Sequence, residues 1–393
     1  MASSPNGLYL PPELLRNLFE FLPQRDLASA CLVSKGWCEL AFRYLHRNRT
    51  IRGISGLERF TAQVVADPQN YLTSCIHSLS LQFQSELEEP PGLIDMVTSF
   101  RRFRWVIPKL KHLKYLEWHE VTYFETDLVI GILRDFAAKC PQLEALTVRC
   151  VTYHPRGRIT TKRLNEAFRF SNLKYLDMFY EDESVWADDI NPHPAVPIET
   201  FDDIVGNAPY VSHLSLEDGG CNVLWDMKNP LKNLSHLRLV LSKEYAATAG
   251  HPSLDHLIDF FTKHPHITDL EVDGFQRFQE TGYSPSTGLF PSLKRFVGPA
   301  AVCMDILTSP TGVHLETIVI KDDYSTFPDY TQSIRELARV IQPLPKLKEL
   351  YFSTSADDKQ GTLDTGSLEM LLAATPALES LGLSCFSLKL VSD

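Results

Sequence analysis

The sequence predicts an α/β chain in two parts: a short three-helix unit, followed by an irregular solenoid in which strand-helix units stack into a horseshoe. Two observations lead to this prediction. The first fifty residues carry three apolar stripes at helical spacing. The remainder carries eleven short leucine-centred segments, and such recurrence is typical of repeat proteins. We expect the three-helix unit at residues 1–50, a linker helix region at 51–75 and the solenoid at 76–393.

The first helix is predicted to begin at Pro12 and to end near Leu22. Proline suits a first helical position because the N–H that it lacks would have no partner there. Glu13 lies where the positive end of the helix dipole favours a carboxylate. Leucines and phenylalanines then recur at helical spacing, until Pro23 makes continuation of the helix unfavourable.

Two more helices are expected directly behind the first. Leu27, Ala30 and Cys31 form a second apolar stripe. Ser34 can cap a third helix, which carries Trp37 in its first turn. Small units bury too little surface to offset the entropy of the chain, so we expect this one to need a neighbour or a partner.

The order and spacing of residues in this segment resemble an F-box. The resemblance rests on a Leu-Pro pair, an Asp-Leu pair and a Val-Ser…Trp pattern between Leu10 and Trp37. Members of that family dock through this unit on the Skp adaptor of SCF-type cullin-RING ubiquitin ligases, while the rest of the chain selects the substrate. The resemblance implies that eight positions supply adaptor contacts and the supporting core: Leu10, Pro11, Leu14, Leu15, Leu22, Leu27, Val33 and Trp37.

The sequence does not separate adaptor contacts from core residues among these eight positions. A plainer interpretation is that the segment is an amphipathic helical cap on a larger domain. That interpretation explains the apolar stripes, but it does not explain the combined pattern of the three motifs. We therefore prefer the F-box interpretation.

Composition is consistent with an intracellular interaction protein. The chain has 393 residues with 44% apolar content, enough for a large core or two domains. It shows neither a basic N-terminal segment followed by an apolar run nor a stretch of about eighteen apolar residues, so we expect no membrane segment. The eight cysteines are scattered without a C-x-x-C motif, which favours a reducing compartment. We expect a cytoplasmic and/or nuclear protein.

Charge is distributed unevenly along the chain. Residues 1–50 hold six Lys and Arg against four Asp and Glu, which leaves 32 against 45 for the remainder, a net charge of −13. Nucleic-acid binding draws much of its affinity from neutralising phosphates, so we expect no nucleic-acid partner. An acidic body does permit a basic protein partner.

The leucine-centred segments are predicted to be strands that follow helices. Amphipathic runs stop at Pro141, Pro265 and Pro345, because proline bars helix continuation and favours extended geometry in the preceding residue. One strand and one helix cannot bury their own apolar faces, so neighbouring copies must stack. The central leucines lie 37, 30, 30, 38, 23 and 33 residues apart: Leu79, Leu116, Leu146, Leu176, Leu214, Leu237 and Leu270. This irregular spacing resembles the degenerate leucine-rich repeats found behind many F-boxes.

Alternation of helices and strands is also compatible with a doubly wound sheet or an eight-fold barrel. Strands in those folds tend to be apolar on both sides. Here one side of each strand is polar or mixed, which indicates a solvent-facing sheet with aromatic anchors and charges suited to a protein partner. The competing view is an ordinary solvated face. The candidate substrate face consists of Glu117, His119, Arg149, Asp177, Phe179, Glu217, Arg238, Glu271, Lys321 and Tyr351.

Three further segments are candidate functional segments. Long connections are expected at 177–200, with five acids around Trp186, and at 273–290, and long loops in compact folds are often functional. The acidic loop would suit a basic substrate segment, although charge runs are usually just solvated. The run RRFRW at 101–105 mixes aromatic and basic residues, which suggests either nucleic-acid or phosphate binding or a partly buried helix. We favour the helix, with its arginines reaching outward or pairing with acids.

Signatures of catalysis and cofactor binding are largely missing from the sequence. There is no G-x-G-x-x-G, no phosphate loop and no G-x-S-x-G elbow. His119-Glu120 begins like a zinc-protease helix, but Tyr123 occupies the place of the second histidine. We expect no catalytic residue, no metal site and no cofactor.

Two classes of function remain. The first is a non-catalytic substrate receptor that docks on the Skp adaptor and binds an unknown protein substrate through the solenoid. The second is an adaptor-bound scaffold or solenoid sensor whose partners are not degraded. Arg149, Arg238 and Lys321 would suit a phosphate, although they come from distant repeats.

Overall fold

The structure is a computed structural model, in which the chain divides into two compact units. The first unit comprises Met1–Cys150, His154–Ile159 and Glu166–Leu173, and the second comprises Val151–Tyr153, Thr160–Asn165 and Lys174–Asp393. The structure describes residues 10–83, 93–119, 126–151, 169–181, 208–218, 230–240, 254–274, 290–321, 335–339, 341, 343–353 and 365–383.

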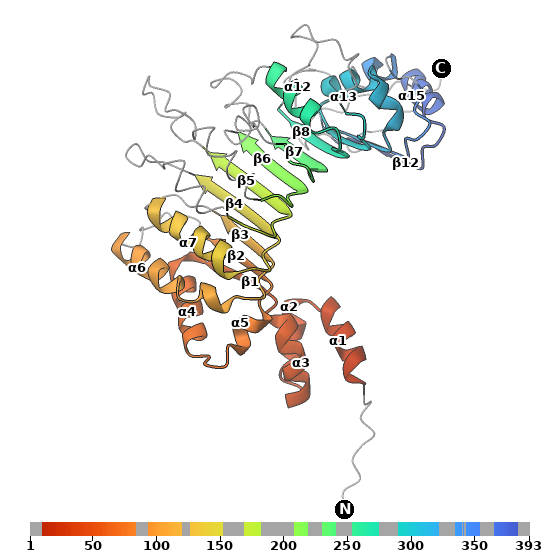
Figure 1. Cartoon of the computed structure of the whole chain (residues 1–393). Helices are drawn as coiled ribbons and strands as arrows, with labels where there is room; N and C mark the ends of the chain where they lie inside the picture. The colour runs from red at the N-terminus through yellow and green to blue at the C-terminus, as the bar shows by residue number, and fades with distance from the viewer. Residues whose placement is uncertain are drawn as a thin grey trace, which may run out of the picture. The chain divides into compact units, whose positions relative to one another are not determined.

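Three short helices open the first unit, as predicted: α1 (Pro12–Phe21), α2 (Gln24–Ala30) and α3 (Lys35–Leu45) (Figure 1). Proline occupies the first position of α1, and the helix ends one residue before Leu22. The Oγ atom of Ser34 accepts a hydrogen bond from the backbone N–H of Trp37 at 3.2 Å. Ser34 therefore caps α3, because it satisfies an amide that has no partner within the helix.

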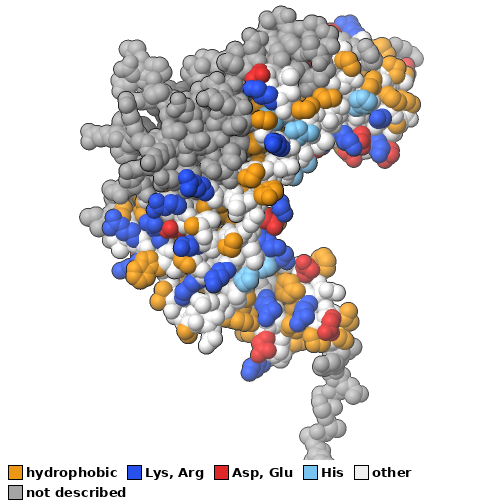
Figure 2. All heavy atoms as spheres, in the orientation of Figure 1, with side chains coloured by type: hydrophobic (Ala, Val, Ile, Leu, Met, Phe, Trp, Pro, Cys, Tyr) orange, Lys and Arg blue, Asp and Glu red, His pale blue; other side chains and the backbone are white. Residues whose placement is uncertain are grey.

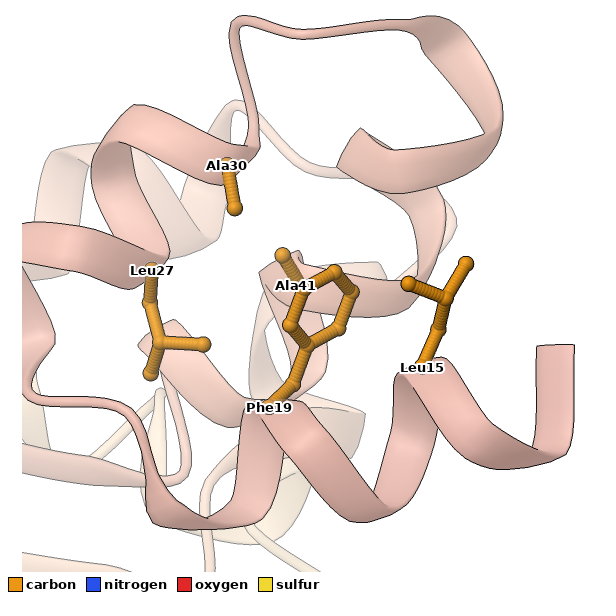
Figure 3. Packing of buried hydrophobic residues seen from close by; sticks show 5 residues of the cluster. All are labelled: Leu15, Phe19, Leu27, Ala30 and Ala41. Carbon is orange, nitrogen blue, oxygen red and sulfur yellow. The ribbon is translucent and has the colours of Figure 1, made fainter. Parts of the chain in front are cut away.

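The three helices enclose a small apolar core of their own. Figure 3 shows the side chains of Leu15, Phe19, Leu27, Ala30 and Ala41 directed toward one another from the three helices. All five are at most 5% exposed. Partly buried side chains pack around this core: Leu22, Cys31, Trp37, Leu40, Tyr44 and Leu45.

The three-helix unit also packs on the helix α5 (Tyr71–Cys75). The ring of Phe42 in α3 stacks on the ring of Tyr71, with centroids 4.9 Å apart. The hydroxyl of Tyr71 donates a hydrogen bond to the carbonyl of Glu39 at 3.4 Å. This contact supplies the neighbour that so small a helical unit needs.

Four parallel strands form the sheet of the first unit, each paired with the next along the chain: β1 (Asn48–Arg52), β2 (Ser78–Gln82), β3 (Tyr115–His119) and β4 (Ala145–Val151). The sheet begins with β1, upstream of the first leucine-centred segment, because the chain enters it directly after α3. The helices between the strands are α4 (Gly53–Val65), α5, α6 (Leu93–Phe103), the 3-10 turn η1 (Ile107–Lys109) and α7 (Thr126–Lys139). In Figure 1, α4, α6 and α7 lie along one side of these strands.

Eight parallel strands form the sheet of the second unit, again in chain order: β5 (Tyr175–Glu181), β6 (His213–Asp218), β7 (His236–Val240), β8 (Asp269–Asp273), β9 (Arg295–Gly298), β10 (Thr317–Lys321), β11 (Glu349–Ser353) and β12 (Ser380–Leu383). Its described helices include α12 (Leu254–Lys263), α13 (Ala300–Leu307), the 3-10 helix η5 (Pro310–His314) and α15 (Thr365–Ala374).

The central leucines occupy the same register in successive strands. Leu176 is paired with Leu214, Leu214 with Leu237, and Leu237 with Leu270, and all four are at most 2% exposed. Burial alternates along β7, β8 and β10, so one side of each strand is core and the other meets solvent. The predicted leucine-rich-repeat solenoid of stacked strand-helix units is therefore confirmed.

The predicted helix ends are also confirmed where the structure describes them. α7 ends at Lys139 and α12 at Lys263, each two residues before a proline. Within the described ranges, no helix has both the length and the apolar character needed to cross a membrane.

Candidate protein-interaction sites

The eight predicted adaptor-binding residues separate into two groups in the folded unit. Leu15 and Leu27 are 5% and 4% exposed and belong to the core. Leu22 and Trp37 are partly buried and pack against that core. The second group is exposed: Leu10 at 37%, Leu14 at 54%, Val33 at 62%, and also Pro11. Of the eight residues, this exposed group offers a partner the most surface in the folded unit.

Three exposed apolar residues of the same unit were missed as candidate contacts. Leu18 is 45% exposed, Phe21 84% and Leu32 88%. Leu14, Leu18 and Phe21 follow one another at helical spacing on α1, so they share a face of that helix. The sequence did contain an indication of them. The apolar stripe of α1 is wider than the surface that the short helices α2 and α3 can bury.

Together these side chains define the exposed apolar set of the three-helix unit: Leu10, Pro11, Leu14, Leu18, Phe21, Leu32 and Val33. Figure 2 shows hydrophobic side chains gathered at the surface over α1. The internal core is complete without them. Large apolar side chains grouped on the surface are typical of protein-protein contact sites.

On the sheet of the first unit, three residues of the candidate substrate face influence one another. His119 Nε2 lies 2.6 Å from Glu117 Oε1, two residues away on the same side of β3. Burial raises the pKa of Glu117, but hydrogen bonds from Ser80 and His119 and the charge of Arg149 outweigh it, so this pKa lies below its ordinary value. Glu117 therefore stays ionised near neutral pH within a polar cluster.

On the sheet of the second unit, tertiary structure brings together three candidate residues from distant repeats. Glu271 Oε1 lies 3.3 Å from Arg238 Nε and 2.8 Å from Lys321 Nζ. Burial raises the pKa of Glu271, but hydrogen bonds and charge from Lys321 and Arg238 more than compensate, so this pKa is lowered. We call Arg238, Glu271 and Lys321 the charged triad.

The arrangement of the charged triad argues against phosphate binding by Arg238 and Lys321. Arg238 and Lys321 already share the carboxylate of Glu271. A phosphate would have to displace that carboxylate or sit beside its negative charge. The triad thus resembles a preformed polar contact point more than an open anion site.

The other predicted residues of this face have different surroundings. Asp177 and Glu217 lie on β5 and β6, half-buried, and Phe179 lies in β5 with its side chain outside the described residues. Tyr351 lies over Gly382 on the neighbouring strand, and its hydroxyl is 2.9 Å from Ser380 Oγ. Tyr351 therefore covers the sheet and does not stand out from it.

A row of rings at the start of β5, β6 and β7 was missed by the sequence interpretation. The imidazoles of His213 and His236 stack at 3.9 Å, and Tyr175 flanks His213 at 6.2 Å. His236 Nε2 lies 3.3 Å from Asp269 Oδ2. The signal was present, because consecutive repeats both read Ser-His-Leu and so place the two histidines in register.

This ring row is fixed by the residues before it. Ser212 Oγ and Ser235 Oγ each lie 2.8 Å from Nδ1 of the following histidine. Burial, and then the proximity of His236, lowers the pKa of His213. The ring row is therefore a rigid surface beside the charged triad, and β7 carries a residue of each, which suits contact with a protein segment.

Several remaining predictions concern other parts of the chain. The acidic loop around Trp186 and the connection at 275–289 lie outside the described residues. In the RRFRW run, Phe103 is buried and Arg104 pairs with Asp135, but Trp105 is 82% exposed, which the interpretation as a partly buried helix did not anticipate. In the described part of the chain, no group of three or more His, Cys, Asp or Glu is placed to hold a metal ion.

The three-helix unit with its capped third helix and its exposed apolar set is an F-box-like domain: the F-box-like family matches residues 8–52. The chain therefore joins an F-box-like domain, the kind of unit that binds Skp-type adaptors, to a sheet of leucine-centred repeats. A comparison with curated proteins found no match.

Two of the solved structures that match this chain are weak likenesses. A protein from Bacteroides fragilis is 15% identical, with 70% of this chain and 77% of that chain covered and a TM-score of 0.40. The complex of Rad7 and Elc1 in yeast is also 15% identical, with 97% and 90% covered and a TM-score of 0.39. At such TM-scores neither likeness carries an argument about this chain.

Proposed function

We propose that the chain is a non-catalytic substrate-recognition subunit of an SCF-type E3 ubiquitin ligase. Its F-box-like domain docks on a Skp-type adaptor, and the polar side of its repeat strands binds a protein substrate. The observation that carries the proposal is that the F-box-like domain has a complete core and still exposes seven apolar side chains. Ubiquitin is transferred by other subunits, and this chain contributes proximity by raising the local concentration of substrate lysines.

Energetics support a docking role for the exposed apolar set. Fully burying one leucine or phenylalanine side chain contributes about 1.5–3 kcal/mol. Association itself costs roughly 4–15 kcal/mol in lost freedom and ordering, so several such side chains must be buried together. Leu14, Leu18 and Phe21 on one face of α1 provide three of them on a single rigid helix.

The strand faces support a protein as the substrate. The charged triad and the ring row are held on neighbouring strands by fixed register, so their side chains lose little freedom on binding. Charges of both signs favour discrimination between partners over raw affinity. The free cysteines of the described residues agree with the reducing cytoplasm or nucleus, where such ligases act.

Adaptor docking is tested by a triple variant of the exposed set, Leu10→Ala, Pro11→Ala and Leu14→Ala, in the full chain. We expect binding to a purified Skp-type adaptor to fall at least tenfold while circular dichroism and the thermal midpoint stay unchanged. The matched control is Tyr210→Ala, Met370→Ala and Leu372→Ala, three residues 57%, 47% and 46% exposed in the second unit. Undiminished adaptor binding by the folded triple variant would rule out docking through this surface.

The receptor role is tested separately from docking. Proteins captured by the full chain are identified, and their half-lives are compared in cells with and without it. Reversing the charged triad with Arg238→Glu and Lys321→Glu should release the captured substrate and lengthen its half-life, with adaptor binding retained. If no captured protein changes its half-life, the alternative of an adaptor-bound scaffold or sensor is favoured.

A further inference from the structure

The helical side of the first unit presents an exposed tryptophan between basic residues. Trp105 follows the last turn of α6 and is 82% exposed. Its backbone N–H donates to the carbonyl of Arg102 at 3.1 Å, so the chain makes a turn directly after the helix. Arg101 and Arg102 lie in the last turn of α6, four and three residues before Trp105, and both are exposed.

The backbone that carries Trp105 is held firmly in place. Phe103, Val106 and Ile107 on either side are at most 1% exposed. Between them, Arg104 Nε lies 2.5 Å from Asp135 Oδ2 in α7. Trp105 is therefore an aromatic side chain on a rigid support, which resembles the anchor of a binding surface.

A glycine in α7 makes room for that ion pair. A Cβ atom at Gly131 would lie only 3.2 Å from Arg104 Nη1, so the guanidinium rests directly on the helix backbone. The ion pair joins the end of α6 to α7. It also pairs the carboxylate of Asp135 with a residue of the same unit. Glu58 on α4 is likewise engaged, since it accepts a hydrogen bond from Ser99 Oγ at 2.6 Å.

Positive charge around Trp105 is concentrated and largely unpaired. Residues 101–114 contain six Lys and Arg and no Asp or Glu, in a chain whose net charge is −11. Arg101, Arg102 and Lys111 form no ion pair with any residue that the structure describes. Figure 2 shows Lys and Arg side chains gathered over α4, α6 and α7 with few acidic ones among them. We call Arg101, Arg102, Trp105, Lys109 and Lys111 the basic tryptophan patch.

The patch extends toward the end of α4. Lys109 Nζ donates to the carbonyl of Val64 at 3.1 Å, which ties η1 to the last turn of α4. The next residue, Val65, is 66% exposed. A partner seated here would meet fixed positive charge together with limited apolar surface.

We propose that the basic tryptophan patch binds an acidic segment of a partner protein, in which Asp and Glu flank an apolar side chain that packs on Trp105. Charge complementarity selects an acidic partner, and the indole selects one that also offers apolar surface. Long nucleic acids are disfavoured because the chain as a whole is strongly acidic. A membrane would require more exposed apolar side chains than Trp105 and Val65. This surface is independent of adaptor docking.

The test measures binding of the full chain to a fluorescent synthetic peptide rich in Asp and Glu around one phenylalanine, by anisotropy at low and high salt. We expect Trp105→Ala to weaken binding at least tenfold, and Arg101→Glu with Arg102→Glu to abolish it together with its salt dependence. The control is Lys232→Glu with Lys348→Glu, two exposed lysines of the second unit, which makes the same change in net charge. The control variant should bind as the wild type does.

The competing ligands are tested in the same assay. A single-stranded oligonucleotide of equal charge and vesicles containing phosphatidylserine should bind much more weakly than the peptide. Tighter binding of either would overturn the choice of a protein partner. Equal peptide binding by the wild type and both patch variants would overturn the site, and unchanged thermal midpoints show that the variants are folded. Adaptor binding by these variants should be unaffected.

Discussion

The ring of Trp37 meets the ring of Phe19 edge-on, with centroids 5.4 Å apart and planes inclined by 68°. Phe19 comes from α1 and is fully buried, whereas Trp37 lies in the first turn of α3. The hydrogen bond from the Trp37 amide to Ser34 Oγ fixes the same turn. The tryptophan of the F-box pattern therefore joins two helices and supports the core of the domain.

Phe19 and Phe21 provide a matched pair, because they lie two residues apart on α1 and are 0% and 84% exposed. Phe19→Ala should destabilise the F-box-like domain by about 3–5 kcal/mol, since it leaves a cavity against Trp37. Phe21→Ala should change stability by less than about 0.5 kcal/mol. Urea unfolding followed by circular dichroism measures both, and equal losses would contradict the assigned core.

Phe21, which should contribute little to stability, should contribute to adaptor binding. Phe21→Ala should weaken adaptor binding in a folded protein, because it removes exposed apolar surface from α1. Titration calorimetry with purified adaptor provides the measurement. Full retention of affinity would place Phe21 outside the docking surface.

His46, at the end of α3, should make the domain sensitive to acid. Burial, and then the charge of Arg49, lowers the pKa of His46 from 6.5 to about 4. Because the unfolded chain takes up this proton first, the contribution of His46 to stability is complete above pH 6.5 and is lost as pH falls toward 4. The urea midpoint should drop in this window, and His46→Gln should reduce the drop.

The imidazole of His46 can also be followed directly by NMR. Titration of its ring signals near pH 6.5 would show that burial and Arg49 do not suppress its protonation.

Glu271→Gln should convert the charged triad into an anion site. With the carboxylate neutralised, Arg238 and Lys321 lose their shared partner and become free to bind an oxyanion. Phosphorus NMR or calorimetry with inorganic phosphate should show at least tenfold tighter binding to the variant than to the wild type. Glu349→Gln on β11 is the control. Wild-type binding as tight as that of the variant would contradict neutralisation by Glu271.

Gly298 on β9 should not tolerate a side chain. A Cβ atom there would lie 2.7 Å from the carbonyl oxygen of Val272 and 2.9 Å from Phe296 Cζ. Because one of these atoms belongs to the backbone, β8 and β9 would have to separate. Gly298→Ala should therefore lower the free energy of unfolding by about 1–3 kcal/mol. Gly36→Ala in α3 should be neutral or stabilising, because a Cβ atom there would meet nothing within 4 Å apart from its chain neighbours and the backbone of its own helix. Thermal unfolding compares them, and similar midpoints would contradict the close strand contact.

Much of the fold follows from local patterns in the sequence. Helical spacing of apolar residues, Pro12 at the start of α1 and Ser34 before α3 each act over a few residues, so they predict these helices directly. Prolines after α7 and α12 mark the helix ends for the same reason. The strand β1 was missed because it carries no central leucine and is defined by its pairing with β2.

The sequence by itself determined an F-box pattern followed by leucine-centred strands, because spacing and residue type are local properties of the chain. Tertiary structure alone decided which leucines of the F-box-like domain are core and which are exposed, since burial depends on how three helices pack. It also placed Glu271 between Arg238 and Lys321, which are 33 and 50 residues away along the chain. Only the register of stacked strands brings such distant side chains within hydrogen-bonding distance.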